Sequence, residues 1–399
     1  MNAAMPNYSN PFFFESPSDR WSFTDRDELM EELGKFLKQK GRRLLVHGMR
    51  RMGKTSLLLN AGRLSGERFV FVDVSAATNL NEVAKKLLAA APAEEESLLP
   101  KLVRLARTFL SSVSISAGGV ELSGELRMED GQKNFESVLS YLNARAGVED
   151  RPWTVCLDEF QDLRILAGER VDWQIRSLIQ EHRNVNYIFS GSDNRLVRWM
   201  SEPNAAFFRQ LQMMEVGAIE TEHLAGWLAQ RSKIGGLARF PYAKGIIEKA
   251  GPRTGDVIRL AMSCFEIATA GKGKFSEESV VPDAMNLLAF KHFAPEFSAQ
   301  WRECNLVQRA VLRAISQDCP PTAIDTIRKF GIRSPSTAHS AVKTLLDRQI
   351  LVQDASADVV FDNPFFRHWV AANGSALSEA QLRLHETFPV NDGEIVSAI

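Results

Sequence analysis

The run GMRRMGKT at residues 48–55 constrains this chain more than any other feature of its sequence. It matches G-x-x-x-x-G-K-[ST], and it lies between an apolar run at 42–47 and a segment with helical spacing at 54–64. In that setting backbone N–H groups can surround phosphates, and the N-terminus of the following helix adds partial positive charge. The pattern predicts a nucleotide-phosphate loop, with a plain glycine turn as the alternative. We assign to it Gly48, Arg51, Met52, Gly53, Lys54, Thr55 and Ser56.

An acidic pair follows a second apolar strand. The residues TVCL at 154–157 run into Asp158 and Glu159. With a phosphate loop upstream, we expect Lys54 to reach the β- and γ-phosphates and Thr55 to hold Mg²⁺ together with Asp158. Glu159 is placed to accept a proton from water, which favours hydrolysis over phosphoryl transfer to a small molecule. A solvated acidic cap at a strand end is the alternative.

The next apolar strand ends in polar residues, FSGSDN at 189–194. A polar side chain beside the phosphate loop can touch the γ-phosphate or order the attacking water. We assign this sensor role to Ser192, with Ser190 and Asn194 as competing choices. An ordinary polar strand terminus is the alternative.

Arg209, in AAFFRQLQMMEV, ends a helical stretch and precedes the last expected strand. An arginine at this position can reach the γ-phosphate of nucleotide bound to a neighbouring subunit and stabilise the transition state. We therefore name it as a candidate arginine finger in a homo-oligomer. A surface salt bridge is the alternative.

The alternation of strands with helices indicates an α/β architecture with a parallel sheet. An inserted β-hairpin at 112–127 interrupts it, because Val113 and Ile115 alternate with serines before a glycine turn. Strands are expected at 42–48, 68–75, 154–158, 186–192 and 213–216. The expected division is an N-terminal arm at 1–19, a core at 20–218, a helical lid at 219–295, a winged helix at 296–372 and a tail at 373–399.

The winged helix is expected from three helices followed by two short strands. The helices are predicted at 306–316, 322–330 and 335–348, with Ser334 as the N-cap of the third and Pro335 at its first position. The strands are predicted around 350–352 and 359–361. Double-stranded DNA is the candidate partner for 320–361, and a structural or protein-docking role is the alternative. Basic residues cluster there: Arg328, Lys329, Arg333, Lys343 and Arg348.

The composition excludes several classes of protein. A net charge of -1 provides no broad basic field for nucleic acid or anionic lipid, so any such contact needs a local patch. The four cysteines are scattered and form no C-x-x-C pair, which is typical of reduced thiols. No apolar run is long enough to span a membrane. The sequence therefore predicts a cytoplasmic protein that does not contact membranes.

These motifs resemble the archaeal-type P-loop ATPases, a branch of the AAA+ and STAND assemblage related to archaeal replication initiators. The resemblance covers roughly residues 10–372. It rests on the entry NPFFFESPSDRWSFTDRDEL, the loop HGMRRMGKTSLLL, the segments CLDEFQDL, FSGS and FFRQL, the glycine hairpin and the closing FDNPFFRHWV. The loop and the DEFQ segment are its most specific motifs.

The resemblance implies an AAA+-type P-loop fold: a parallel sheet, a helical lid and a C-terminal winged helix-turn-helix domain. It also places Phe23 and Arg26 near the adenine, although a helix-capping role fits them as well. A second sensor is expected in the lid, within AGPRTGDVIRLA. Val257 stands there where the family signature has proline, so both Arg259, our first choice, and Arg253 stay open.

The sequence as a whole predicts a protein that binds ATP or ADP with Mg²⁺ and hydrolyses ATP. Its nucleotide state would reposition the lid and the winged helix, with DNA as one candidate partner. The alternative is a nucleotide-stabilised regulatory or docking module with negligible turnover.

Overall fold

The computed structural model describes residues 9–14, 23–92, 98–109, 113–116, 119–122, 131–192, 194–270, 278–354 and 357–373. The chain divides into two compact units. One, the sheet unit, consists of Phe14–Glu220 together with Arg253–Gly255. The other, the helical unit, consists of Met1–Phe13, Thr221–Pro252 and Asp256–Ile399. The boundary at Glu220 lies two residues beyond the core limit expected from the sequence.

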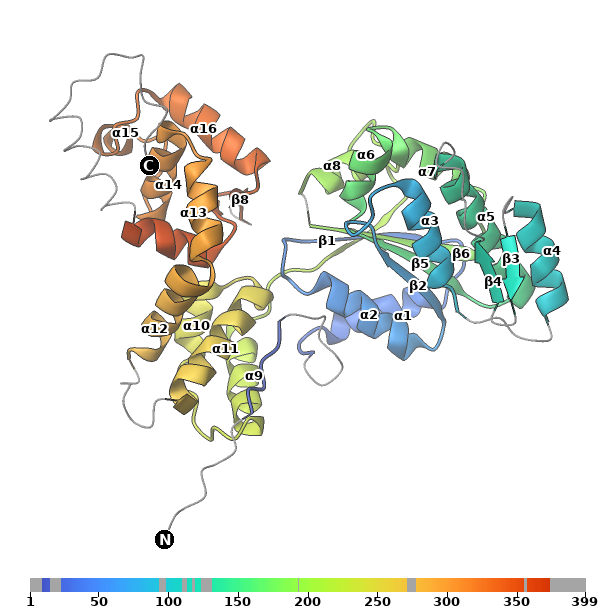
Figure 1. Ribbon diagram of the computed structural model, residues 1–399, viewed down its shortest axis with the longest axis horizontal. Coiled ribbons are helices and arrows are strands. Elements are labelled where there is room, and N and C mark those ends of the chain that lie inside the picture. The colour runs from blue at the N-terminus through green and yellow to red at the C-terminus, as the bar shows by residue number, and fades with distance from the viewer. Residues whose placement is uncertain are drawn as a thin grey trace, which may run out of the picture. The chain divides into compact units, whose positions relative to one another are not determined.

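The sheet unit is built on a parallel five-stranded sheet in the order β2-β5-β6-β1-β7 (Figure 1). Each strand falls on an apolar run that the sequence analysis assigned to a strand, so the expected parallel sheet is confirmed. Neighbouring β5, β6 and β1 therefore end at the same edge, directly before the polar segments assigned to the site. The strands are β1 (Arg43–His47), β2 (Arg68–Asp73), β5 (Trp153–Asp158), β6 (Val185–Gly191) and β7 (Gln212–Glu215).

Helices cover both faces of this sheet. They are α1 (Asp27–Leu37), α2 (Lys54–Ser65), α3 (Leu80–Ala89), α4 (Leu99–Phe109), α5 (Gly131–Glu149), α6 (Leu163–Ala167), α7 (Val171–Ile179) and α8 (Asn194–Ser201), with a 3-10 turn at Phe160–Asp162. The expected hairpin is present as β3 (Val113–Ser116) paired antiparallel with β4 (Gly119–Leu122).

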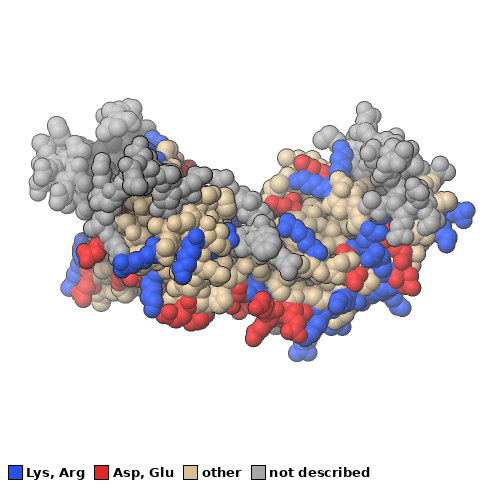
Figure 2. All heavy atoms as spheres, turned by 90° about the horizontal axis from the view of Figure 1, so that it is seen from below, with Lys and Arg blue, Asp and Glu red and all other residues tan. Residues whose placement is uncertain are grey.

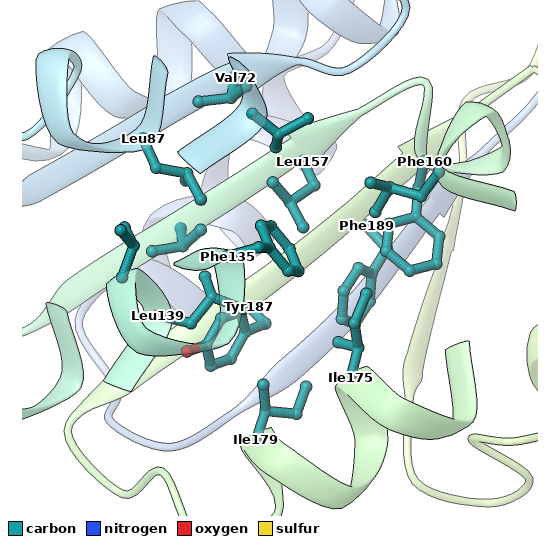
Figure 3. Packing of buried hydrophobic residues seen from close by; sticks show 14 of the residues in the cluster. Val72, Leu87, Phe135, Leu139, Leu157, Phe160, Ile175, Ile179, Tyr187 and Phe189 are labelled. Atoms are coloured by element: carbon teal, nitrogen blue, oxygen red, sulfur yellow. The ribbon is translucent and has the colours of Figure 1, made fainter. Parts of the chain in front are cut away.

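Alternating strand residues form two separate cores, because successive side chains on a strand point to opposite faces. On one face Leu157 and Phe189 pack with Phe135 of α5 and Ile175 of α7 (Figure 3). The opposite face buries a second set against α1 and α2. This set includes Leu44, Val46, Cys156, Ile188, Leu33 and Leu57. The sheet is thus held from both sides, and its carboxyl edge is a rigid platform for the site.

The helical unit begins with the helices expected for a lid. They are α9 (Thr221–Ile234), α10 (Ala243–Ala250), α11 (Thr254–Ala270), α12 (Val280–Leu287), a π-helical turn (Leu288–His292) and α13 (Ala294–Arg302). Thr254 and Gly255 open α11 but belong to the sheet unit.

Residues 9–13 of the expected N-terminal arm pack into this helical unit. Phe12 is buried, with its ring centroid 5.7 Å from Phe240 and 6.1 Å from Phe265. Asn10 Nδ2 donates to Met262 O at 3.1 Å, and Arg231 Nη2 donates to Pro11 O at 2.9 Å. This segment is therefore a structural part of the helical unit. Residues 1–8 and 15–19 of the arm, and residues 20–22 of the expected core, lie outside the described residues.

The winged helix follows the expected order. Its elements are α14 (Leu306–Ser316), α15 (Ile324–Lys329), α16 (Pro335–Asp347), β8 (Leu351–Gln353) and β9 (Val359–Phe361), with β8 and β9 paired antiparallel. Ser334 caps α16 as expected, since its side chain accepts from the Thr337 amide. A closing helix at 364–373 was not expected, and its aromatic residues pack on α13 through a tilted Phe297–Phe366 pair and an edge-to-face Trp301–Trp369 pair. Residues 374–399 of the expected tail lie outside the described part.

Charges of both signs are interspersed on the face seen in Figure 2, as the near-zero net charge leads one to expect. Within the described residues, no helix combines the length and the apolar character that a membrane span requires.

Candidate nucleotide site

The loop between β1 and α2 depends on glycine at two positions. Gly48 has φ 148°, and a Cβ there would lie 2.5 Å from Val216 O, so no side chain fits. Gly53 has φ 91° and forms the left-handed N-cap of α2. Arg51 also adopts a positive φ, 65°. Met52 is buried in the core under α2, which anchors the loop from below.

Lys54 is buried at the start of α2. Its ammonium donates to Gly48 O and to Met49 O, both at 2.9 Å. Burial lowers the pKa of Lys54, and the nearby carboxylates of Glu159 and Asp158 oppose that shift. The ammonium is thus held inside the loop that would surround phosphates, in a place where solvent screens its charge poorly.

Thr55 and Asp158 meet across two elements of the sheet unit. Thr55 Oγ1 donates to Asp158 Oδ2 at 2.6 Å. Asp158 is the buried last residue of β5, and burial raises the pKa of its carboxyl while the Thr55 hydrogen bond opposes that shift. Its other oxygen, Oδ1, is buried without a hydrogen-bond partner among the described residues. A hydroxyl beside a carboxylate with an unused oxygen is a donor set that suits Mg²⁺.

Glu159 lies just beyond the strand with φ 50°, so the chain turns sharply there and carries the carboxylate out of the sheet. Ser192 Oγ donates to Glu159 Oε2 at 3.0 Å, and Gln161 Nε2 donates to the same oxygen. Arg50 Nε in turn donates to Ser192 Oγ at 3.4 Å. Ser192, the sensor candidate, therefore contacts the candidate base directly.

Gln161 and Arg50 were not singled out from the sequence. Gln161 is buried, and both it and Arg50 reach the site only because the turn after β5, the end of β6 and the phosphate loop converge. The position of Gln161 two residues after Glu159 was the available signal, because DEFQ was already recognised as one segment. Of the competing sensor residues, Ser190 is buried inside β6 and Asn194 begins α8.

Arg209 lies in the turn between α8 and β7. It is exposed, it has φ 59°, and its guanidinium carbon lies 5.0 Å from the centroid of the Phe208 ring. An exposed arginine stacked on an exposed aromatic ring is available to a second molecule, and its role as a finger stays a prediction.

Phe23 and Arg26 lie close to the loop in the sheet unit. Phe23 packs on the core formed by α1 and α2. Arg26 Nη2 donates to Met52 O at 3.2 Å and to Gly217 O at 2.8 Å. Arg26 therefore ties the phosphate loop to the chain that leaves β7. A contact of either residue with adenine stays a prediction.

The two lid arginines are placed differently. Arg253 is buried and belongs, with Thr254 and Gly255, to the sheet unit that holds the phosphate loop. Arg259 belongs to the helical unit, where its guanidinium carbon lies 4.8 Å from the centroid of the Phe293 ring. Only Arg253 shares a unit with the loop, and the sensor role of each stays a prediction.

Gly255 contacts the phosphate loop through its backbone. Its amide donates to Arg51 O at 2.9 Å, and a Cβ there would lie 3.0 Å from Arg51 Cβ. We expect Gly255→Ala to displace Arg51 and weaken ATP binding about fivefold, the equivalent of about 1 kcal/mol. Gly226→Ala on α9 is the matched control, since a Cβ there has nothing within 4 Å. Equal dissociation constants for both variants, by titration with a fluorescent ATP analogue, would show that this contact does not position the loop.

Comparison with known proteins shows which folds this chain is similar to. Residues 295–372 match a family described as "Probable winged helix domain". The chain is similar to the solved Walker-type ATPase of Pyrococcus abyssi, with a TM-score of 0.62 and 16% identity over 90% of this chain and 99% of that chain. It is also similar to the Aeropyrum pernix Orc1 protein, solved in complex with DNA, with a TM-score of 0.48 and 14% identity over 90% and 94% of the two chains. No curated protein matches the sequence.

The likeness to the Walker-type ATPase, together with the strand order, confirms the expected fold class. The chain has an α/β fold similar to that of the solved Walker-type ATPase, built on a five-stranded parallel sheet, and a C-terminal winged helix domain. The resemblance drawn from the motifs is confirmed at the level of the fold. The matched winged helix begins one residue before the expected domain and ends at the same residue.

Proposed function

We propose that this chain is a Mg²⁺-dependent ATPase that acts as a molecular switch. The observation that carries the proposal is the convergence of Lys54, Thr55, Asp158, Glu159 and Ser192 at one edge of the sheet. These side chains come from three neighbouring parallel strands and the loops after them. Each supplies a function that ATP hydrolysis needs, and the glycine loop supplies the backbone geometry.

The residues fit the two groups that the proposal requires. The loop 48–55 would hold the β- and γ-phosphates of ATP or ADP, with Lys54 exchanging its contacts to two carbonyls for contacts to phosphate oxygens. Thr55 and Asp158 would hold Mg²⁺, because the buried Asp158 Oδ1 is unused. When bound, the ion neutralises negative charge on the phosphate oxygens.

Glu159 would act as the general base for hydrolysis. The hydrogen bonds from Ser192 and Gln161 both fall on Oε2, and they fix the direction of the carboxylate. Oε1 can then accept a proton from water while Ser192 senses the γ-phosphate side. Arg50, through Ser192, links this network to the phosphate loop.

Three contacts support the switch. Arg51 O accepts from Gly255, and Met52 O accepts from Arg26, which also holds Gly217. Gly217 and Gly255 lie within a few residues of two of the points where the chain crosses between units, Glu220 and Asp256. A change in loop conformation on nucleotide binding or hydrolysis would therefore act on both connections, whichever of Arg259 and Arg253 serves as second sensor.

ATP turnover by the purified chain, with Mg²⁺ and with and without duplex DNA, tests the proposal. Mg²⁺-dependent turnover supports the switch. Binding without turnover supports the alternative, a nucleotide-stabilised regulatory or docking module. The absence of both binding and turnover would overturn the nucleotide site itself.

Arg209 would complete the site of a neighbouring copy in a homo-oligomer. We expect Arg209→Ala to bind ATP normally and to hydrolyse it about 10³-fold more slowly. Mixing it with Glu159→Gln should restore part of the activity, because some interfaces then join an intact Arg209 to an intact Glu159. Arg170→Ala, at another exposed arginine of the sheet unit, is the control. A wild-type rate per molecule that does not change with concentration, in a monomeric chain, would exclude action between subunits.

The winged helix would contact double-stranded DNA through part of the basic cluster within 320–361. Two members of the cluster already contact other side chains. Arg348 Nη2 pairs with Glu303 Oε2 at 2.7 Å, and Lys329 Nζ donates to Gln317 Oε1 at 3.1 Å. Arg328, Arg333 and Lys343 are exposed and remain the phosphate-contact candidates. Duplex binding that weakens steeply between low and moderate salt would support this contact, and no binding at low salt would exclude it.

A further inference from the structure

A groove of about 480 Å³ runs between α15 and the start of α16 in the winged helix. Its volume lies in the range of ligand-binding clefts. Ile324, at one end of α15, is 64% exposed, while Ile327 and Ile332 are buried beneath the groove. The lining residues are Ile324, Ile327, Arg328, Gly331, Ile332, Arg333, Ser334 and Pro335. The groove therefore offers an apolar floor with an exposed isoleucine.

Positive charge flanks this floor. Arg328 and Arg333 are exposed, and neither side chain makes a hydrogen bond or an ion pair with any residue that the structure describes. Of the nearby carboxylates, Asp318 is engaged by Arg367 at 2.7 Å, and Asp325 lies on the exposed side of α15. The N-terminus of the 13-residue α16, capped by Ser334, adds partial positive charge at the same place. The ligand that matches this groove is both aliphatic and acidic.

A peptide matches the groove better than a duplex does. A DNA duplex would gain little from the apolar residues of the groove, because its phosphates bind charged groups and its base edges are recognised mainly by polar side chains. The exposed face of α16 offers only one cation, Lys343, among Ser336, His339 and Ser340, and it ends in Asp347. An acidic peptide with aliphatic side chains would instead cover Ile324 and pair with Arg328 and Arg333 at once.

We propose that residues 386–399 of the same chain bind this groove. Their sequence, ETFPVNDGEIVSAI, contains Glu386, Asp392 and Glu394 and no Lys or Arg. It combines those acids with apolar side chains, as the groove requires: Phe388, Val390, Ile395, Val396 and Ile399. Because groove and segment belong to one chain, the local concentration is on the order of millimolar, so even a weak contact is well populated.

The docked segment covers Arg328 and Arg333, two of the three cations left for DNA. The inference deepens the proposed function, on which its regulatory part rests: the segment is a built-in competitor for the DNA contact. Docking itself needs neither nucleotide nor DNA, so it can be tested separately.

Disulfide formation in the nucleotide-free full chain tests the docking. In a Cys319→Ser background, where the remaining cysteines are buried, Ile324→Cys is combined with Val396→Cys. We expect intramolecular oxidation about tenfold faster than for Leu306→Cys with Val396→Cys. Leu306 is a matched control, because it is 63% exposed on the same domain and does not line the groove. Adding Arg328→Glu and Arg333→Glu should make the two oxidation rates equal, since the two ion pairs with acidic residues of the segment then become repulsions.

Equal oxidation rates for the two cysteine pairs, or a product that is a covalent dimer, would overturn the proposal. Duplex binding at low salt then tests the regulatory part. The variant Glu386→Gln, Asp392→Asn, Glu394→Gln should bind duplex DNA several-fold more tightly than the wild type. Unchanged affinity for duplex DNA would overturn the proposed competition between the segment and DNA. If neither chain bound duplex DNA, the DNA contact of the proposed function would be wrong. The docking of the segment in the groove is decided by the cross-linking experiment alone.

Discussion

Replacing Lys54 with Ala will abolish ATP binding, with a loss of affinity of about 10²-fold or more. Lys54 is the buried first residue of α2, and its ammonium donates to two loop carbonyls, Gly48 O and Met49 O. Charge-assisted hydrogen bonds in such a place contribute about 1.5–3 kcal/mol each, and the backbone amides of the loop cannot replace the missing positive charge. Titration with a fluorescent ATP analogue measures the loss directly.

The control for this prediction is Lys35→Ala. Lys35 is exposed on α1 and pairs with Glu31 across one helical turn, so its removal takes one positive charge from the same unit without touching the loop. Lys54→Met provides a second check, because it preserves the packing of the buried stem. Thermal melting without nucleotide shows that each variant is folded. If folded Lys54→Ala bound the analogue as tightly as the wild type, the phosphate-loop assignment would be wrong.

The parallel sheet and its site could be predicted because short stretches of sequence determine both. Each strand is a short apolar run, and the residues of the site follow directly after the strands that carry them. Lys54 and Thr55 open a helix after β1, and Asp158 ends β5. Parallel strands bring their carboxyl ends together, so the contact between Thr55 and Asp158, 103 residues apart, follows from topology alone.

Other parts depend on contacts that no local pattern encodes. Phe12 is buried in the helical unit by Phe240 and Phe265, more than 200 residues further along the chain. The closing helix at 364–373 was not expected, and its aromatic side chains pack on α13, which lies far earlier in the chain. Gln161 joins the site because the chain turns at Glu159 with a positive φ, a conformation that a glutamate rarely adopts.

The basic cluster of the winged helix shows that sequence alone does not tell which charged side chains pair with a neighbour. The sequence places five basic residues close together, yet the fold pairs Arg348 with Glu303, 45 positions earlier. It leaves Arg328 and Arg333 beside an apolar groove instead. Counting charges along the chain therefore overestimates the surface available to a polyanion, because pairing is decided by tertiary neighbours.

Glu159→Gln should keep ATP binding and lower hydrolysis by about 10²–10⁴-fold. The amide of glutamine can still hold water by hydrogen bonding, but it cannot accept the proton that the attacking water must lose. The sharp turn at Glu159 and the contacts from Ser192 and Gln161 belong to the local backbone and to neighbouring residues, so the exchange of one oxygen for nitrogen should leave the fold intact.

Two measurements separate this role from a merely structural one. Glu169→Gln, at an exposed glutamate ten residues further along, should keep both wild-type binding and wild-type turnover. Ser192→Ala removes one hydrogen bond that directs the carboxylate but leaves the base in place, so it should reduce turnover by less than Glu159→Gln does. Full turnover in Glu159→Gln would mean that the proton is accepted elsewhere. Loss of ATP binding in the same variant would instead show that Glu159 holds the loop together rather than activating water.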